Sequence, residues 1–180
     1  MELEPGQILH DRYRIMDKLG QGGMGEVHLA WDESLGIKVA VKMNYNPEPK
    51  NMAQFFKEAQ LLAALRHQNL PRVTDYFVIG KQQYLVMDFI PGDDLGSRLK
   101  SEGAQPLSKV LRWAAQLSAS LSYMHNQDPP VIHRDIKPAN IKLSSNGEAI
   151  LVDFGIAKAD ASQTHTATGA SGYTPGYAPP

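Results

Sequence analysis

Two cations, a carboxylate and an amide gather within residues 133–140, which read His133-Arg134-Asp135-Ile136-Lys137-Pro138-Ala139-Asn140. A carboxylate can accept a hydroxyl proton, a lysine can steady the oxygens of a transferring phosphoryl group, and an asparagine can bind a hard cation. Downstream, Asp153-Phe154-Gly155 follows an apolar segment and supplies a second candidate carboxylate ligand for magnesium. Polar loops can carry such residues by chance, but the two segments together point to phosphoryl-transfer chemistry.

A glycine-rich segment precedes them near the N-terminus, and it reads Gly20-Gln21-Gly22-Gly23-Met24-Gly25-Glu26-Val27. Glycine allows a backbone to approach phosphate oxygens closely and to adopt positive φ. The segment joins two expected strands, whereas a dinucleotide-binding loop leads into a helix, and no Gly-Lys-Ser/Thr ends it as in a Walker A loop. Taken alone, it is equally compatible with a flexible hairpin.

The strand that follows, Val39-Ala40-Val41-Lys42, places one lysine at the end of an apolar run. Alternation puts Ala40 and Lys42 on the same side of that strand. A lysine beside a glycine-rich hairpin can reach phosphates as a point charge, although a solvated lysine at a strand end is the simpler alternative. Glu58, sixteen residues later on an expected helix, could pair with Lys42 and hold its ammonium in place.

The hydrophobic pattern changes its period near Pro91, which indicates a boundary between two parts of the chain. Before it, alternation predicts strands, and a helix over residues 51–66 interrupts them after the breaks expected at Pro47 and Pro49. After it, apolar spacings of three and four predict a long helix over residues 107–126. Short strands at 141–143 and 150–152 follow, joined by an Asn146-Gly147 turn. The predicted strands of the first part are 13–19, 27–31, 38–43, 73–78 and 84–89.

The composition excludes several functional classes. Lys plus Arg number 18 against 19 for Asp plus Glu, so no strongly basic field is present to hold nucleic acid. No apolar run is long enough to span a bilayer, and residues 1–5 lack the basic and apolar regions of a signal peptide. The chain contains no cysteine, which excludes disulfides, thiol catalysis and cysteine-ligated metals. We expect a cytoplasmic protein.

The order of these motifs resembles the signature set of protein kinases. The chain resembles a bacterial eukaryotic-like serine/threonine kinase. Lys137, two residues after Asp135, resembles the Ser/Thr branch rather than the tyrosine branch. This resemblance implies an α+β, protein-kinase-like fold. Residues 1–90 would form an ATP-binding N-lobe, an antiparallel sheet with one helix. Residues 91–180 would form a truncated, mainly helical C-lobe with a helix after the hinge, the long helix, the catalytic loop and the activation segment.

The resemblance also implies ATP and Mg²⁺ as cofactors and a protein Ser/Thr hydroxyl as the phosphate acceptor. Asp135 would align that hydroxyl, assisted by Lys137, while Lys42 and Glu58 would hold the phosphates. Asn140 and Asp153 would bind magnesium. The remaining nucleotide contacts would come from Leu19, Gly20, Gln21, Gly22, Gly23, Met24, Gly25, Val27, Ala40, Met87 as gatekeeper, and the hinge residues Asp88 and Ile90.

Three further features follow from the same resemblance. Lys142 occupies the floor of the adenine site, where related kinases often carry an apolar residue, and its methylene stem could cover the ring. An apolar column would comprise Leu62, Val73, His133 and Phe154. Arg134 would grip a phosphorylated activation segment, in which Thr164, Thr166, Thr168 and Ser171 are candidate acceptors and Thr174 would contact the catalytic loop.

The resemblance also implies missing helices of the large lobe after Pro180, and with them the main packing partner of helix 107–126. Its apolar stripe should then be partly exposed and favour a homodimer or other self-association. Three interpretations stay open here: an active kinase completed by a second chain, a catalytically impaired nucleotide-binding remnant that acts as an interaction module, and a fragment of a larger kinase.

Overall fold

The computed structural model describes residues 3–22, 25–44 and 49–153, and these divide into two compact units. The first unit contains the described residues up to Ala64 together with Arg72–Phe89, and the second contains Leu65–Pro71 and the described residues from Ile90 onward. Gly23, Met24, Phe154 and the candidate phosphate acceptors Thr164, Thr166, Thr168, Ser171 and Thr174 lie outside the described residues.

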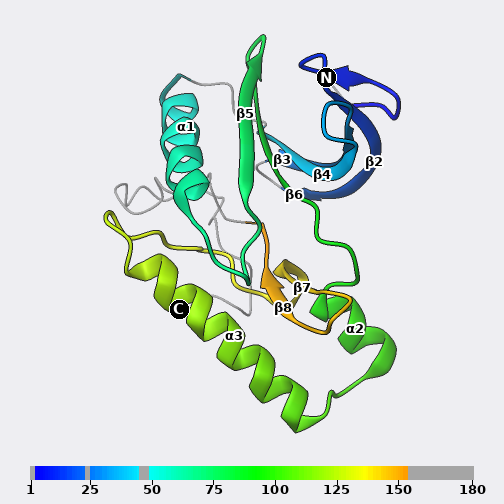
Figure 1. Cartoon of the computed structure of the whole chain (residues 1–180), viewed down its shortest axis with the longest axis vertical. Helices are drawn as coiled ribbons and strands as arrows, with labels where there is room; N and C mark the ends of the chain where they lie inside the picture. Colours follow the sequence, from blue (N-terminus) through cyan, green and yellow to red (C-terminus); the bar gives the residue numbers. More distant parts are fainter. Residues whose placement is uncertain (1–2, 23–24, 45–48, 154–180) are drawn as a thin grey trace, which may run out of the picture. The chain divides into compact units, whose positions relative to one another are not determined.

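The first unit is built on one antiparallel sheet of six strands (Figure 1). Strands β2, β3 and β4 form the predicted meander, because glycine-rich and turn residues connect alternating apolar segments. Strand β6 then lies between β4 and β5, so the sheet ends on β5. In the order of the sheet, the strands are β1 (Ile8–Leu9), β2 (Tyr13–Gly22), β3 (Gly25–Asp32), β4 (Ile37–Asn44), β6 (Gln82–Asp88) and β5 (Val73–Ile79).

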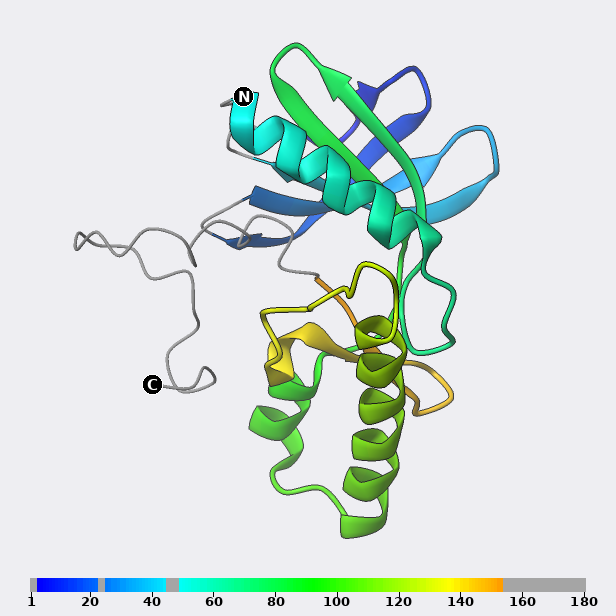
Figure 2. The ribbon, with the colours of Figure 1, turned by 90° about the vertical axis from the view of Figure 1, so that its left-hand side faces the viewer.

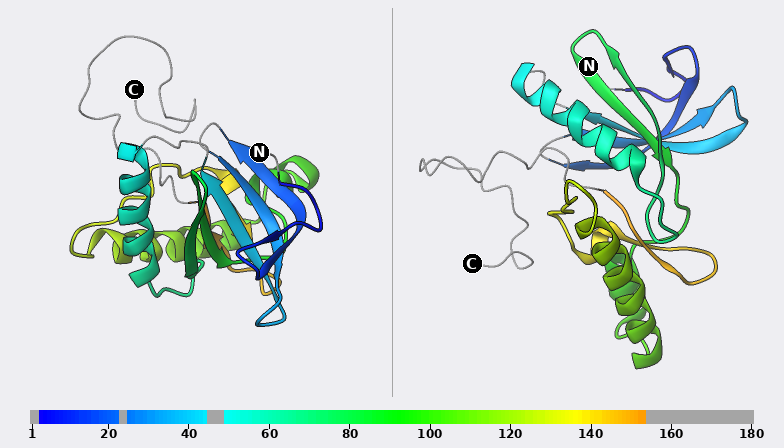
Figure 3. Two further views of the ribbon diagram at one scale, coloured as in Figure 1. Left: turned by 90° about the horizontal axis from the view of Figure 1, so that it is seen from above. Right: turned by 60° about the vertical axis from the view of Figure 1, so that its left-hand side comes forward.

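Helix α1 (Pro49–Ala64) packs beside β5 in this unit (Figure 3). It begins two residues earlier than predicted, at one of the two prolines that were expected to break the chain. Proline is tolerated in the first turn of a helix, because the amide that it lacks would have no partner there. The predicted apolar face is buried, with Phe55, Ala59 and Leu62 each less than 5% exposed.

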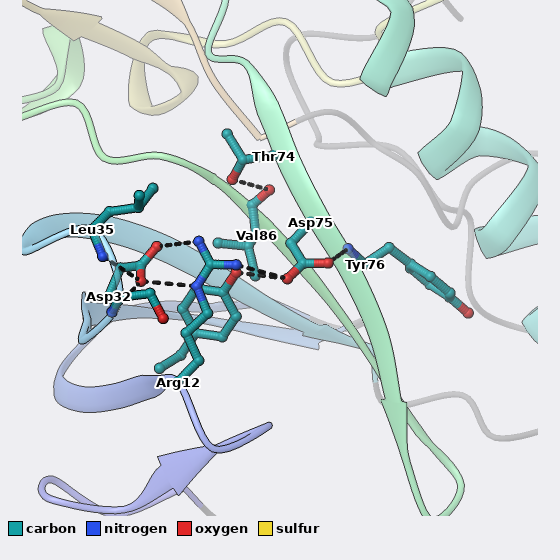
Figure 4. Close-up of polar contacts among 9 residues, drawn as sticks. Arg12, Asp32, Leu35, Thr74, Asp75, Tyr76 and Val86 are labelled. Carbon is teal, nitrogen blue, oxygen red and sulfur yellow. Dashed lines mark hydrogen bonds and ion pairs between the residues drawn. The ribbon is translucent and has the colours of Figure 1, made fainter.

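The other side of the sheet holds the main core of the first unit. Phe77 stacks on Tyr13 and on Tyr84, with ring centroids 5.7 and 5.1 Å apart. Polar contacts close the core at the turns, where the Arg12 guanidinium joins Asp32 to Asp75 (Figure 4). The remaining buried members of this core are Leu3, Leu9, Ile15, Ala30, Val39, Val41, Met43 and Val86.

The described part of the second unit contains two α-helices, a short 3₁₀ turn and a short hairpin (Figure 2). Helix α3 (Leu107–His125) closely matches the predicted long helix, and β7 (Ile141–Leu143) and β8 (Ala149–Leu151) form the predicted hairpin. The Trp113 indole donates to the Gly147 carbonyl at 3.0 Å, which fixes α3 to the hairpin turn. Helix α2 (Leu95–Glu102) had no predicted bounds; Asp94 caps it by accepting from the Ser97 amide at 2.9 Å.

Residues Leu65–Pro71 belong to this second unit although they follow α1 directly. Asn69 explains this assignment. Its side-chain amide donates to the Ala149 carbonyl at 2.8 Å, and its backbone carbonyl accepts from the Leu151 amide at 3.0 Å. The Tyr123 hydroxyl also accepts from the Arg66 amide at 2.9 Å. This segment is therefore joined to β8 and α3 by hydrogen bonds that no local pattern in the sequence predicts.

Candidate active site

The register of the sheet brings four of the predicted nucleotide-binding side chains onto one face of the first unit. Val27 pairs with Lys42, Leu29 with Ala40, and Ala40 with Met87. Paired residues of antiparallel strands project to the same side, and so do residues two apart on one strand. Val27, Ala40, Lys42 and Met87 therefore share the face opposite the main core.

The glycine-rich segment contributes the end of β2 and the start of β3, where Gly22 pairs with Gly25 and Gln21 pairs with Glu26. A side chain at Gly25 would collide with the backbone carbonyl of Met43, so β3 and β4 approach too closely there for any other residue. At Gly20 and Gly22 no atom lies within 4 Å of an added Cβ, so the hairpin surface around these two glycines is open.

Lys42 and Glu58 lie on β4 and α1 of the same unit, and both side chains are half-buried. Leu19 lies at an irregularity of the β2–β3 pairing and is 46% exposed. The ion pair expected between Lys42 and Glu58 stays a prediction, and so do the nucleotide contacts expected of Leu19 and of the glycines.

The predicted hinge begins at the end of β6. Met87 is 5% exposed, and the Asp88 carboxylate accepts from the backbone amide and from Nε of Arg72, both at 3.0 Å. The side-chain bond to Asp88 and the negative charge of that carboxylate raise the pKa of the exposed Arg72 guanidinium. The side chain of Asp88 is thus engaged by Arg72, which agrees with a role for its backbone rather than its carboxylate. Ile90 is the first residue of the second unit after β6.

The second unit brings Asp135, Lys137 and Asn140 together. The Asn140 amide donates to the Asp135 carbonyl at 2.7 Å and to its Oδ2 atom at 2.9 Å, and Lys137 Nζ lies 3.1 Å from the same Oδ2. A short 3₁₀ turn, Pro138–Asn140, carries the asparagine back toward the aspartate. The carboxylate is only 11% exposed, so two donors orient a largely buried anion.

Asp153 is tied to the same loop through its neighbour Val152. The Val152 amide donates to the Asn140 carbonyl at 2.9 Å, and the buried His133 ring donates through Nε2 to the Val152 carbonyl at 3.1 Å. Both Arg134 (φ 65°) and Asp153 (φ 59°) adopt the left-handed conformation, which non-glycine residues seldom adopt and which clusters at functional sites. Hydrogen bonds thus hold the predicted magnesium ligands Asn140 and Asp153 near each other in the fold.

Lys142, the residue predicted to form the floor of the adenine site, holds its ammonium in a hydrogen bond to the backbone. Its Nζ atom donates to the Gly92 carbonyl at 3.0 Å, and the neighbouring Leu143 amide donates to the Asp93 carbonyl at 3.1 Å. Burial alone would raise the pKa of Asp94, but its bonds to Ser97 and the charge of Lys142 outweigh burial and lower it. No local pattern in the sequence predicts the contact between Lys142 and Gly92. The spacing from Asp94 to Ser97, by contrast, is a recognisable helix-capping pattern.

Comparison with known proteins shows the family of the chain. Residues 13–180 match the model of the protein kinase domain, which is nearly the whole chain. The chain belongs to the protein kinase family. The serine/threonine-protein kinase pkn2 of Myxococcus xanthus is 38% identical over 182 residues, covering 96% of this chain and 22% of that protein. PknA of Mycobacterium tuberculosis is 36% identical over 172 residues, covering 91% and 39%.

Solved kinase structures agree with the fold. The PknI kinase domain of Mycobacterium tuberculosis superposes with a TM-score of 0.72 at 28% identity, covering 87% of this chain and 64% of that one. This kinase chain therefore spans well under half the length of the two curated relatives and less than two thirds of that solved domain. The α+β kinase fold and the membership in the serine/threonine kinases, expected from the sequence, are confirmed. No helix in the described ranges has the length and apolar character needed to cross a membrane.

Proposed function

We propose that this kinase binds ATP with Mg²⁺ and transfers the γ-phosphoryl group to serine or threonine hydroxyls of a protein. The observation that carries the proposal is the Asp135–Lys137–Asn140 cluster, to which Asp153 is joined through Val152. Phosphoryl transfer depends mainly on positioning and charge stabilisation, and this cluster supplies an oriented carboxylate, a cation and an amide oxygen. The two units would correspond to the two lobes of the family.

The protein groups fit the chemistry of the two cofactors. Asn140 uses its amide nitrogen to hold Asp135, so a cation would bind through its Oδ1 atom, together with the Asp153 carboxylate. In the described part of the chain, no three His, Asp or Glu side chains gather closely enough to hold a metal ion by themselves. Magnesium is commonly bound by one or two carboxylates together with substrate phosphates. When bound, magnesium would neutralise charge on the phosphates.

In the proposed reaction, the bond between the γ-phosphorus and the bridging oxygen of ATP breaks while a bond to the acceptor hydroxyl forms. Asp135 orients that hydroxyl and receives its proton, and ADP leaves with the bridging oxygen. Lys137, 3.1 Å from Asp135, is placed to stabilise charge on the transferring group. On the first unit, Val27, Ala40 and Met87 would contact the adenine. Lys42, on the same face, would bind the α- and β-phosphates, and Glu58 would orient Lys42.

Radiolabelled ATP transfer to a generic protein substrate tests this proposal, with Asp135→Asn as the matched variant. We expect transfer by the unaltered chain that falls by at least about a hundredfold in the variant, because the variant keeps the shape of the side chain and loses its charge. A parallel thermal-shift titration should show stabilisation by ATP that requires magnesium. Equal transfer by both proteins, or no effect of nucleotide, would contradict the proposal.

A second function, self-association, is favoured by one feature of α3. Leu107, Val110 and Leu111 are 71%, 43% and 60% exposed, and they lie within one and a half turns of the same helix. Exposed apolar side chains that gather in this way favour an interface. We propose that α3 mediates homodimerisation. The variant Lys42→Ala separates a kinase from a catalytically impaired interaction module. A kinase would lose its transfer activity in this variant, whereas an interaction module would keep its self-association.

A further inference from the structure

The first unit contains a cluster of three ionisable side chains, two of them buried, beside the glycine-rich hairpin, and the proposed reaction does not use it. Lys18 Nζ lies 2.8 Å from Glu26 Oε2, and His28 Nε2 lies 3.1 Å from Glu26 Oε1. The Glu26 and His28 side chains are 2% and 1% exposed, while Lys18 is 35% exposed. We call Lys18, Glu26 and His28 the hairpin clamp.

Burial of a carboxylate is costly unless cations and donors compensate for the lost water. Burial raises the pKa of the Tyr84 phenol, and the negative charge of the nearby Glu26 carboxylate raises it further. Glu26, Met43 and Tyr84 occupy consecutive paired positions across β3, β4 and β6, so their side chains share the core face of the sheet. A buried glutamate on this core face adds a charge that packing alone does not need, so we infer that its carboxylate has a further role.

The clamp joins the two strands of the hairpin where their pairing is irregular. The register of β2 against β3 shifts between Lys18 and Gly20, immediately before the first glycine. Lys18 reaches across that shift, because its ammonium also donates to Gln21 Oε1 at 2.9 Å. One lysine thus connects β2 on both sides of the irregularity and, through Glu26, connects β2 to β3.

We propose that Glu26 is a positioning residue for the nucleotide phosphates, acting through Lys18 on the backbone of the glycine-rich hairpin. This inference rests on the proposed binding of ATP. Glycines lose more conformational freedom than other residues when they become ordered, so a hairpin built from them aligns its amides at a high entropic cost. A clamp at the base of the hairpin removes part of that cost before the nucleotide arrives, and pre-organisation of this kind strengthens binding.

The inference predicts a difference between two ligands. The adenine contacts proposed above come from Val27, Ala40 and Met87, which lie on the opposite face of the sheet from Glu26, so the clamp should affect ATP and leave adenosine almost unaffected. A residue that merely stabilised the fold would weaken both ligands equally. The comparison therefore separates a positioning role from a structural one.

Calorimetric titration of the unaltered chain and of Lys18→Met with ATP plus magnesium, and separately with adenosine, makes this comparison. Methionine keeps the length of the lysine stem and removes the charge. We expect ATP affinity to fall about tenfold and adenosine affinity to change less than about twofold. Lys38→Met is the matched control, because Lys38 is an exposed lysine on β4 at the other end of the sheet, paired with Trp31. It should leave both affinities unchanged.

Lys18→Met could destabilise the chain by leaving the Glu26 charge without its lysine, so the double variant Lys18→Met/Glu26→Gln is measured beside it. Removing both charges relieves the cost of an uncompensated carboxylate, and the selective loss of ATP affinity should persist. Equal losses for ATP and adenosine, or unchanged ATP affinity in the double variant, would overturn this inference alone. Absence of magnesium-dependent ATP binding by the unaltered chain would overturn the proposed function together with it.

Discussion

Replacing Asp32 with asparagine removes the charge that holds two turns of the first unit together. The Asp32 carboxylate accepts from Nε and one terminal nitrogen of Arg12, at 2.9 and 2.7 Å, and from the backbone amides of Ser34 and Leu35, at 3.0 and 3.2 Å (Figure 4). Arg12 also lies 3.8 Å from Asp75, to which the Tyr13 hydroxyl donates at 2.6 Å. One carboxylate therefore anchors a network that reaches β5.

The expected magnitude follows from the burial of the pair. The side chain of Asp32 is 2% exposed and that of Arg12 is 32% exposed, so the pair is intermediate between surface and buried ion pairs. Breaking a surface pair costs about 0–1 kcal/mol and breaking a buried pair about 3–5 kcal/mol. We expect Asp32→Asn to lower the free energy of unfolding by about 2 kcal/mol, which corresponds to a Tm decrease of about 4–8 °C for a chain of this length.

The neighbouring pair Arg14–Glu33 supplies a matched control, since its side chains are 50% and 37% exposed. Thermal unfolding followed by circular dichroism should show a Tm decrease of less than about 3 °C for Glu33→Gln. Equal decreases for Asp32→Asn and Glu33→Gln at pH 7 would refute the assignment of the stabilisation to burial of the Asp32 pair.

The same measurement has a defined pH dependence. The hydrogen bonds from Arg12, assisted by the two turn amides, lower the pKa of Asp32 in spite of its burial. A carboxylate whose pKa is lower in the folded state contributes stability above its unfolded pKa of about 3.9 and loses that contribution as the pH falls through its folded pKa. The Tm difference between the unaltered chain and Asp32→Asn should therefore be constant near neutral pH and shrink below about pH 4. A difference that grows on acidification would contradict this sign.

Three further predictions concern the second unit. Gly92→Ala should destabilise the chain by about 1–3 kcal/mol, because φ is 106° there and a Cβ would lie 2.5 Å from the Leu143 carbonyl oxygen; an unchanged Tm would contradict this. Lys142→Met keeps the aliphatic stem and removes the ammonium that donates to Gly92, so nucleotide affinity by calorimetry should stay within about twofold, and a tenfold loss would show that the ammonium itself matters. Leu111→Glu should convert any dimer to monomer in light scattering, because it places a charge on the exposed face of α3, and a dimer that persists would locate the interface elsewhere.

Local sequence patterns predicted most of the strands and the long helix, because the backbone period alone determines which side chains face the core. These patterns failed where the structure of a segment depends on its place within a helix or on the strand with which it pairs. Helix α1 begins at Pro49 because a first-turn proline gives up no hydrogen bond. Strand β1 has two residues and exists through its pairing with β2. The place of β6 between β4 and β5 depends on pairing between distant segments.

The amino-acid sequence alone was enough to indicate Asp135, Lys137 and Asn140 as a cluster, because all three lie within one short loop whose geometry is local. Only the tertiary structure revealed the clamp of Glu26 by Lys18 and the bond from Lys142 to Gly92, fifty residues away. Contacts of this second kind depend on strand register, on a single irregularity in pairing and on how distant segments pack. These are determined by the free energy of the whole fold, and no short stretch of residues encodes them.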